Sequence, residues 1–227
     1  MTMSDDPFAQ AAQHTGAKTS GIEALQLPSD LQVAACMRDW LSRTTRADRA
    51  DPDPSAAPAL DTRLFAKLIA ARDARNELAL LGLQAHEWRA LLARHFAGYF
   101  GHATMPALPQ AISPSEHASF MRALHSLLIA NASTAVHVDD ARCLATIIVH
   151  ACLRPDHLWR DLGLAGRDEV TWMLTRYFPA LVALNVENLR WKKFLAAQCA
   201  LSLGLPPGPA PGCPGCEDYG YCFASRT

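Results

Sequence analysis

Residues 142–150 read Arg-Cys-Leu-Ala-Thr-Ile-Ile-Val-His, and residues 63–71 read Arg-Leu-Phe-Ala-Lys-Leu-Ile-Ala-Ala. Each stretch is followed by Leu-Gly-Leu, which begins at Leu81 after the first and at Leu162 after the second. Three further residues then recur in the same order, as Glu87, Arg94 and Phe96 and as Glu169, Arg176 and Phe178. Two interpretations are open: two similar helical hairpins packed as a pseudo-repeat, or a chance likeness between Ala/Leu-rich helices.

The pattern of apolar residues predicts an all-α fold, an irregular multi-helix bundle. Apolar residues recur at spacings of three and four, and strand signals are almost absent. Ser29 is expected to cap a first helix, and Ser113-Pro-Ser-Glu116 forms a capping box that starts a later one. The other expected helices are two within 61–100 that are broken near Gly82, and those over 138–153, 157–162, 168–178 and 186–203.

The chain divides into three parts by composition. Residues 1–20 are small and polar without apolar periodicity, which predicts a disordered lead. Residues 21–203 are expected to form the helical domain, with a connector at 44–60 and a proline-bearing loop at 101–113. Residues 204–227 form an irregular tail rich in Gly, Pro and Cys.

The charge balance excludes several classes of partner. The 227 residues include 21 Lys and Arg against 22 Asp and Glu, so the formal net charge is −1. Such a balance argues against nucleic acid or an anionic membrane as the main partner. Hydrophobic residues make up 50% of the chain and charged residues 19%, which is enough apolar surface for a core.

The seven cysteines point to a reducing setting. An odd number cannot pair completely within one chain, and the opening MTMSDDPFAQ has Asp5 and Asp6 where a signal peptide would have a basic start. No apolar run approaches the roughly 18 residues of a spanning helix. We therefore expect a cytoplasmic protein, in which clustered cysteines serve as metal ligands before they form disulfides.

The tail carries the strongest chemical signal. Between Gly204 and Cys222, ten of nineteen residues are Gly or Pro and three are Cys. Such a composition is not expected to form a helix or to bury a core, so a metal is the natural candidate for ordering it. Cys213 and Cys216 have the spacing at which two thiolates reach one metal, and Cys222 adds a third.

The type of metal stays open on these residues alone. An iron–sulfur cluster accepts three protein thiolates and leaves a corner for another ligand. Tetrahedral zinc needs a fourth ligand, and no histidine lies nearby in the sequence. Cys199 is a candidate for that position, although packing explains it equally well. The remaining alternative is a flexible tail whose thiols bind nothing. The other three cysteines, Cys36, Cys143 and Cys152, are expected in the core.

Two further features lie close to the tail in the sequence or carry ligand chemistry. Arg190, Lys192 and Lys193 form a basic patch that could stabilise an anionic cluster or molybdate, or dock an acidic partner, although a solvated helix face is the commoner explanation.

His157 opens a short helix that Asp156 is expected to cap and Gly163 to end. It is a secondary metal candidate, against the usual case of a histidine paired with a carbonyl or carboxylate. No Ser/His/Asp arrangement, phosphate-binding glycine loop or pair of carboxylates with a nearby base is evident.

Several motifs together resemble the NifQ family over residues 142–223. They are Asp156-His-Leu-Trp159, Asp161-Leu-Gly-Leu164, Phe178-Pro179 with Asn185, Arg190-Trp-Lys-Lys-Phe194 and Cys213-x2-Cys216-x5-Cys222-Phe223. The resemblance implies a protein that binds molybdenum within an iron–sulfur cluster and donates it for assembly of the nitrogenase iron–molybdenum cofactor. It implies a carrier without catalytic turnover, whose partners are the scaffold complex and the nitrogenase iron protein.

The tail departs from the family pattern C-x4-C-x2-C-x5-C, because Gly208 stands at the first position. Either three thiolates suffice, or Cys199 substitutes, or this member has lost part of the site. Gly208→Cys is expected to tighten cluster retention unless that position is too far from the metal. The rival hypothesis is a zinc-stabilised helical interaction module whose tail is purely structural.

Overall fold

The computed structural model describes residues 57–100, 110–111 and 114–224. These residues form α-helices and short 3-10 helices, and no β-strand occurs among them, which confirms the all-α prediction. The predicted lead, the helix capped by Ser29, Cys36 and most of the 44–60 connector lie outside the described residues.

The first helical hairpin consists of α2 (Ala57–Asp73) and α3 (Ala85–Phe100), joined through the 3-10 helix η2 (Leu78–Leu81). The predicted break near Gly82 is confirmed, since Gly82 follows η2 in the left-handed region with a φ of 75°. A side chain has no room there, because a Cβ atom would lie 2.1 Å from Cδ2 of His150. Only glycine fits this position without strain.

The second hairpin has the same order of elements. It consists of α5 (Val138–Cys152), the short helix α6 (Leu158–Asp161) and α7 (Arg167–Tyr177). Gly163 ends α6 as predicted, in the left-handed region with a φ of 69°. A Cβ atom at Gly163 would lie 2.1 Å from Cβ of Ala71.

The two hairpins contact each other reciprocally at these glycines. Ala71 and His150 are the last residues of the two similar stretches, and Gly82 and Gly163 occupy the same place in the two Leu-Gly-Leu sequences. Each glycine therefore packs against the end of the other hairpin's first helix. This crossed arrangement is typical of two similar units related by a pseudo-twofold axis.

Ionic contacts repeat the same crossed pattern. Arg94 of α3 pairs with Asp140 of α5 at 2.7 Å, and Arg176 of α7 pairs with Asp61 of α2. Both arginines and both aspartates hold matching places in the two copies. Chance likeness between helices would not produce matching partners, so the structure supports the pseudo-repeat.

Three helices extend the bundle beyond the hairpins. The 3-10 helix η3 (Ser115–His117) leads into α4 (Ala118–Ala130), which packs against α5 and α9 (Trp191–Ser202). The predicted capping box is not seen as such: Pro114 precedes η3 without a side-chain hydrogen bond at the cap, and Ser113 lies outside the described residues. The sequence analysis did not predict α8 (Pro179–Leu184), which begins with a proline at its first position.

The last long helix begins later than predicted. The expected start was Val186, but α9 begins at Trp191, and Asn188 lies in the left-handed region with a φ of 52°. The side chain of Asn185 holds this turn, because its oxygen accepts from the Leu189 N–H at 2.8 Å and its amide donates to the Leu189 carbonyl at 3.0 Å. The asparagine thus satisfies backbone groups that a longer helix would have used.

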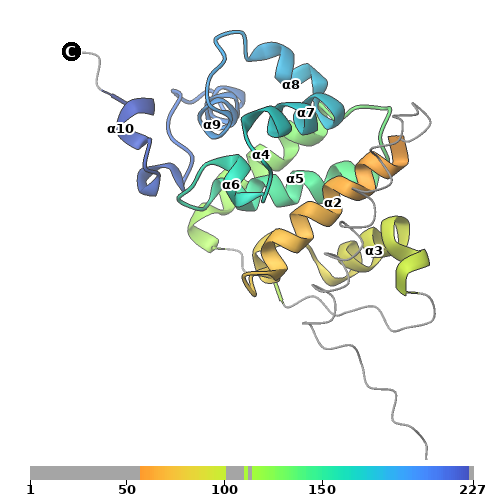
Figure 1. Ribbon diagram of the computed structural model, residues 1–227. Coiled ribbons are helices and arrows are strands. Elements are labelled where there is room, and N and C mark those ends of the chain that lie inside the picture. The colour runs from red at the N-terminus through yellow and green to blue at the C-terminus, as the bar shows by residue number, and fades with distance from the viewer. Residues whose placement is uncertain (1–56, 101–109, 112–113, 225–227) are drawn as a thin grey trace, which may run out of the picture.

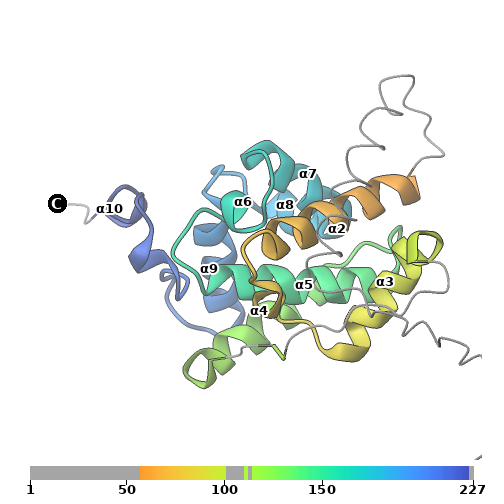
Figure 2. The ribbon, with the colours of Figure 1, turned by 60° about the horizontal axis from the view of Figure 1, so that its bottom comes forward.

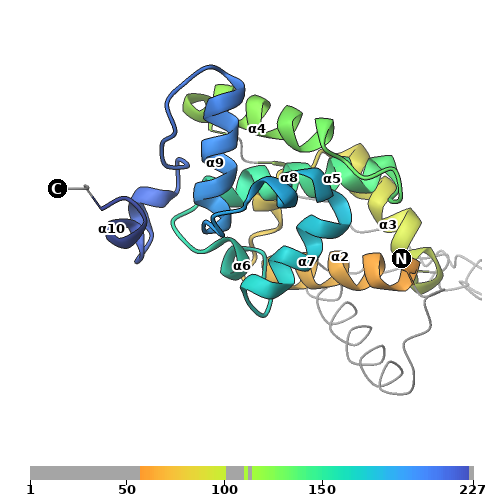
Figure 3. The same ribbon diagram turned by 90° about the horizontal axis from the view of Figure 1, so that it is seen from above.

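The tail lies at one edge of the molecule. α5 runs through the middle of the bundle, and α10 (Tyr219–Cys222) projects beyond α6 and α9 in all three ribbon views (Figures 1, 2 and 3). Large side chains fill the core between the helices, among them Phe65, Trp88, Tyr177, Phe178 and Phe194. Within the described ranges, none of the helices has the length and apolar character needed to cross a membrane.

Candidate functional site

The three tail thiols line one pocket. Cys213, Cys216 and Cys222 lie there with side chains from the α6 region and from the start of α9. In the part of the chain that the structure describes, no three His, Cys, Asp or Glu side chains are arranged to hold a metal ion as they stand. The thiols therefore share a pocket without forming a complete metal site as they stand.

The tail is more structured than its composition predicts. It contains the 3-10 helix η4 (Cys213–Gly215) and the four-residue helix α10, and it buries Ala210 completely. The expectation that this segment forms no helix and buries no core is therefore wrong. The composition of the tail disfavours a core of its own, but the helical body supplies a surface on which the tail packs.

Gly212 fixes where the tail meets the body. Its N–H donates to the carbonyl of Cys152 at 3.0 Å, at the C-terminal end of α5. A Cβ atom on Gly212 would lie 2.0 Å from the carbonyl oxygen of Arg154, so any larger residue would push the tail away. This close approach brings Cys213 into a buried position beside α5.

Positive charge surrounds the thiols. Burial raises the pKa of the Cys213 thiol, and the ammonium group of Lys192 acts against that rise. Burial likewise raises the pKa of Cys222, and Arg190 and Lys193 oppose it. Since only the thiolate binds metal, the three cations favour the ligating form of the site.

Lys192 belongs to a buried ionic network and not to a solvated helix face. Its side chain is only 7% exposed, and Nζ lies 2.6 Å from Oδ2 of Asp161 and 2.8 Å from the Arg154 carbonyl oxygen. Arg154 and Arg72 also bond to Asp161. Burial alone would raise the pKa of Asp161, but Lys192 and Arg154 outweigh it and lower that pKa, which keeps the carboxylate charged.

The other two members of the basic patch contact the tail directly. Arg190 pairs with Asp218 at 2.7 Å, and Nζ of Lys193 donates to the carbonyl oxygen of Cys222. The aromatic residues of the same segment belong to the core, because Trp191 and Phe194 are buried edge to face with ring centroids 5.8 Å apart. The patch thus joins the body to the tail.

The structure brings His157 into the same pocket as the thiols. Its Nε2 lies 3.2 Å from Oδ2 of Asp218 and 3.3 Å from Oε1 of Glu217, and its ring is parallel to that of Trp159. The predicted cap is wrong by one residue: His157 is the cap of α6, and Asp156 instead accepts from the His157 N–H at 2.7 Å.

The structure assigns no pocket role to Cys199. It is buried in α9 and does not line the pocket, and Cys143 and Cys152 are buried as predicted. Cys152 lies next to the tail, which no spacing in the sequence indicates, and burial raises the pKa of its thiol to about 12. Gly208 is also outside the pocket lining, and a Cβ atom there would meet nothing within 4 Å.

The acidic pair Glu217 and Asp218 was also missed by the sequence analysis. Its position between Cys216 and Cys222 was the available signal, since a carboxylate next to a thiolate disfavours the thiolate unless a cation offsets it. The cations that offset this pair come from α9 and from the α6 region.

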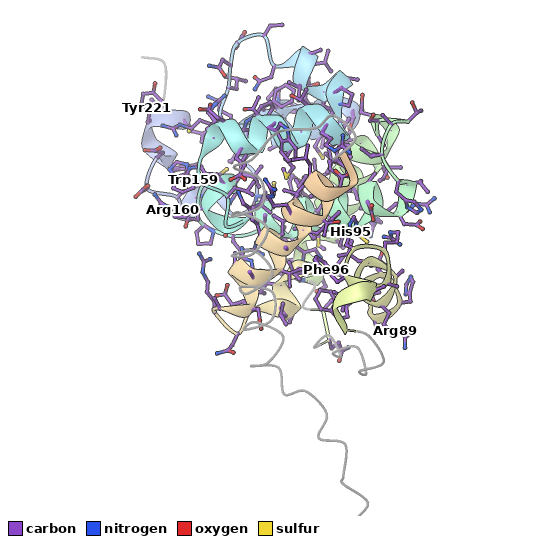
Figure 4. All side chains as sticks on the ribbon, turned by 45° about the vertical axis from the view of Figure 1, so that its right-hand side comes forward. Arg89, His95, Phe96, Trp159, Arg160 and Tyr221 are labelled. Atoms are coloured by element: carbon purple, nitrogen blue, oxygen red, sulfur yellow. The ribbon has the colours of Figure 1, made fainter. Side chains whose placement is uncertain are left out.

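A Thr/His/Asp arrangement lies within the helical body, outside the thiol pocket. Oγ1 of Thr62 is 2.9 Å from Nδ1 of His95, whose Nε2 is 3.0 Å from Oδ2 of Asp140. The His95 ring is packed 4.9 Å from that of Phe65 in the core, far from Trp159 and Tyr221 in Figure 4. The arrangement links α2, α3 and α5, and its contacts account for it as a structural one.

Comparison with known proteins gives one family. The family model described as NifQ matches residues 64–224. A Sinorhizobium fredii (strain NBRC 101917 / NGR234) protein named "Protein NifQ homolog" is 37% identical over 145 residues, which are 63% of this chain and 60% of that protein. A Rhodobacter capsulatus "Protein NifQ" is 32% identical over 64% of this chain and 77% of its own length. An Azotobacter vinelandii "Protein NifQ" is 42% identical over 37% of this chain and 43% of its length. No solved structure matches the chain.

Proposed function

The chain belongs to the NifQ family, whose role lies in nitrogen fixation and nitrogenase cofactor metabolism, and we propose that it carries molybdenum within an iron–sulfur cluster. It donates that molybdenum for assembly of the nitrogenase iron–molybdenum cofactor, in the cytoplasm and without catalytic turnover of its own. The observation that carries the proposal is that Cys213, Cys216 and Cys222 all line the same pocket.

The donor set fits a cluster better than an isolated hard cation. Thiolates are the protein ligands of iron–sulfur clusters, and such clusters accept three of them when another group takes the remaining corner. A thiolate-ligated cluster carries negative charge, which Lys192, Lys193 and Arg190 offset at the pocket wall. The cluster is cargo, so its acceptors are the scaffold complex and the nitrogenase iron protein.

One observation favours a second candidate function. His157 lies in the pocket with the three thiols, and three cysteines with one histidine form a common structural zinc site. In that case the metal would stabilise the tail, and the protein would act as a helical interaction module. The two candidates use the same pocket, so the bound metal distinguishes them.

A matched series of cysteine variants tests the proposed ligand set. We expect Cys216→Ser to lose most of its iron, sulfide and molybdenum after anaerobic reconstitution, because it removes a thiol from the pocket. Cys199→Ser is the control, since that thiol is buried outside the pocket lining. Equal metal contents in the two variants would contradict the proposal.

The same series locates the fourth ligand. If His157→Gln retains iron and sulfide while Cys216→Ser loses them, three thiolates hold the cluster and the corner is free. Gly208→Cys restores the family pattern at a position with open space around it. Tighter cluster retention in that variant would mean that the tail rearranges to bring residue 208 to the metal.

A further inference from the structure

The acidic pair Glu217–Asp218 makes all of its described ion pairs with side chains of the helical body. Oδ2 of Asp218 lies 2.7 Å from Arg190 and 3.2 Å from Nε2 of His157. Oε1 of Glu217 lies 3.2 Å from Arg160 and 3.3 Å from the same His157 nitrogen. The pair therefore bridges the tail, between two of its thiols, to the α6 region and to the start of α9.

Cation contacts continue along the rest of the tail. Nζ of Lys193 donates to the Cys222 carbonyl and lies 5.1 Å from the ring centre of Phe223. The guanidinium of Arg190 lies 5.4 Å from the ring centre of Tyr221. Tyr221 is labelled on the same side of the molecule as Trp159 and Arg160 in Figure 4.

Full burial of the tail ends where these charged contacts begin. Ala210 and Cys213 are buried against the body, but no residue from 214 to 224 is buried. Beyond Cys213 the apolar attachment is only partial, because Tyr219 and Phe223 are partly buried against the core. Beyond that point, ion pairs, cation–ring contacts and the Lys193 hydrogen bond add to this partial packing and link the tail to the body.

We propose that Glu217 and Asp218 are positioning residues that form a clasp with Arg160, Arg190 and His157. The clasp holds Cys216 and Cys222 in the pocket that they line together with Cys213, and the pocket opens when the clasp releases. The identity of the cargo rests on the proposed function, but the clasp itself rests only on these contacts.

The clasp is weak because its members are partly in water. The side chains of Glu217 and Asp218 are 61% and 31% exposed, and those of Arg160 and Arg190 are each 42% exposed. An exposed ion pair shifts an equilibrium by at most roughly fivefold, and salt weakens it further. A clasp of several such pairs keeps the thiols in place and still lets the tail open, as a carrier requires.

Chymotrypsin cleavage of the cargo-free, full-length protein tests the clasp. Tyr219, Tyr221 and Phe223 are cleavage sites within the clasped segment, and cleavage follows the open population when opening is fast. The test variant is Glu217→Gln/Asp218→Asn. The control is Asp168→Asn/Glu187→Gln, which neutralises two exposed carboxylates outside the tail. Fragments are followed by mass spectrometry at 50 mM and 1 M NaCl, with a short peptide substrate to correct for salt effects on the protease.

We expect the test variant to be cleaved about tenfold faster than wild type at 50 mM salt and to show little salt dependence. Wild type and the control should be cleaved slowly at 50 mM and several-fold faster at 1 M. Equal cleavage of test variant and wild type at both salt concentrations would overturn the proposal.

A charge swap separates pairing from a general loss of structure. Arg190→Asp and Asp218→Arg should each accelerate cleavage, and the two together should return it toward the wild-type rate. A double variant cleaved as fast as the faster single variant would show that the Arg190–Asp218 pair does not hold the tail.

Cargo loss provides the link to the proposed function. In anaerobically loaded protein, Glu217→Gln/Asp218→Asn should surrender iron to a chelator several-fold faster than the control variant. If cleavage responds as expected but the protein takes up no cluster, the clasp stands and the proposed function fails. If the protein loads normally and neither cleavage nor iron loss changes, the clasp fails and the proposed function stands.

Discussion

His150 is the last residue of the second similar stretch, and its ring occupies the space that Gly82 leaves free. Burial, together with the nearby guanidinium of Arg154, lowers the pKa of His150 to about 4. Arg122 and His125 line the same groove between α4 and α5, and the pKa of His125 is also lowered, chiefly by burial. The folded protein therefore favours neutral histidine at this position.

This histidine makes stability depend on pH. A histidine whose pKa is lowered by folding binds its proton first in the unfolded chain, so stability is complete above about pH 6.5 and falls as the pH approaches 4. We expect a loss of about 2 kcal/mol between pH 7 and pH 5, from urea unfolding at each pH. His150→Gln should remove much of that loss, whereas His86→Gln, at an exposed position, should leave it unchanged. An unaltered pH dependence in His150→Gln would contradict the assignment.

Some site residues could be predicted from local sequence spacing, and others depend on contacts between distant parts of the chain. Cys213, Cys216 and Cys222 could be predicted because two-residue and five-residue spacings are local properties of the chain. The neighbourhood of His157 and the burial of Lys192 could not, since both depend on where α6 and α9 meet the tail. Cys199 is close to the tail in the sequence, but its thiol is buried in the core and lies outside the pocket lining.

At the scale of the elements, the two crossed glycine contacts determine how the hairpins pack. Gly82, Gly163 and Gly204 all have positive φ angles, of 75°, 69° and 68°. The first two meet the opposite hairpin, whereas a Cβ atom on Gly204 would meet nothing within 4 Å. An alanine at position 204 would therefore suffer backbone strain without overpacking, so this position measures the strain separately.

We expect Gly204→Ala to cost about 1 kcal/mol, from left-handed backbone strain alone. Gly82→Ala and Gly163→Ala should each cost a further 1–3 kcal/mol, because the new methyl group enters occupied space. Gly163→Ala should be the more severe, since its obstacle is the Cβ atom of Ala71, which cannot rotate away. The measurement is urea unfolding of the three variants at pH 7.5. Equal losses in all three would mean that the hairpins do not meet closely at these glycines.

The helices themselves were largely predictable, and their ends were not. α5, α6 and α7 follow the expected ranges within one residue at each end, because their apolar periodicity is strong. α9 begins later than its apolar periodicity predicts, because the side-chain hydrogen bonds of Asn185 hold a turn before it. The separate helix α8 was not predicted at all. Local side-chain to backbone hydrogen bonds decide such boundaries, and a periodicity argument does not include them.

At the scale of the whole molecule, the two hairpins of the pseudo-repeat pack together, with α4 and α9 beside them and the tail at the edge (Figure 2). The likeness of the two stretches was visible in the sequence, but two interpretations remained open until the crossed contacts were known. Arg154 and Arg72 extend the pattern, because each donates to a backbone carbonyl of the opposite hairpin, at Leu80 and at Asp161. The second hairpin meets the tail through Cys152, His157 and Arg160, which places the site at this copy.

The central claim is that the pocket carries an iron–sulfur cluster with molybdenum, and the metal content of freshly purified protein tests it most directly. The protein is purified without oxygen from cells supplied with iron and molybdate, and its iron, acid-labile sulfide, molybdenum and zinc are measured per chain. The account predicts iron, sulfide and molybdenum together in wild type, and their loss in Cys213→Ser/Cys216→Ser/Cys222→Ser. Stoichiometric zinc without iron or sulfide would contradict it and would favour the structural zinc site of three cysteines and His157.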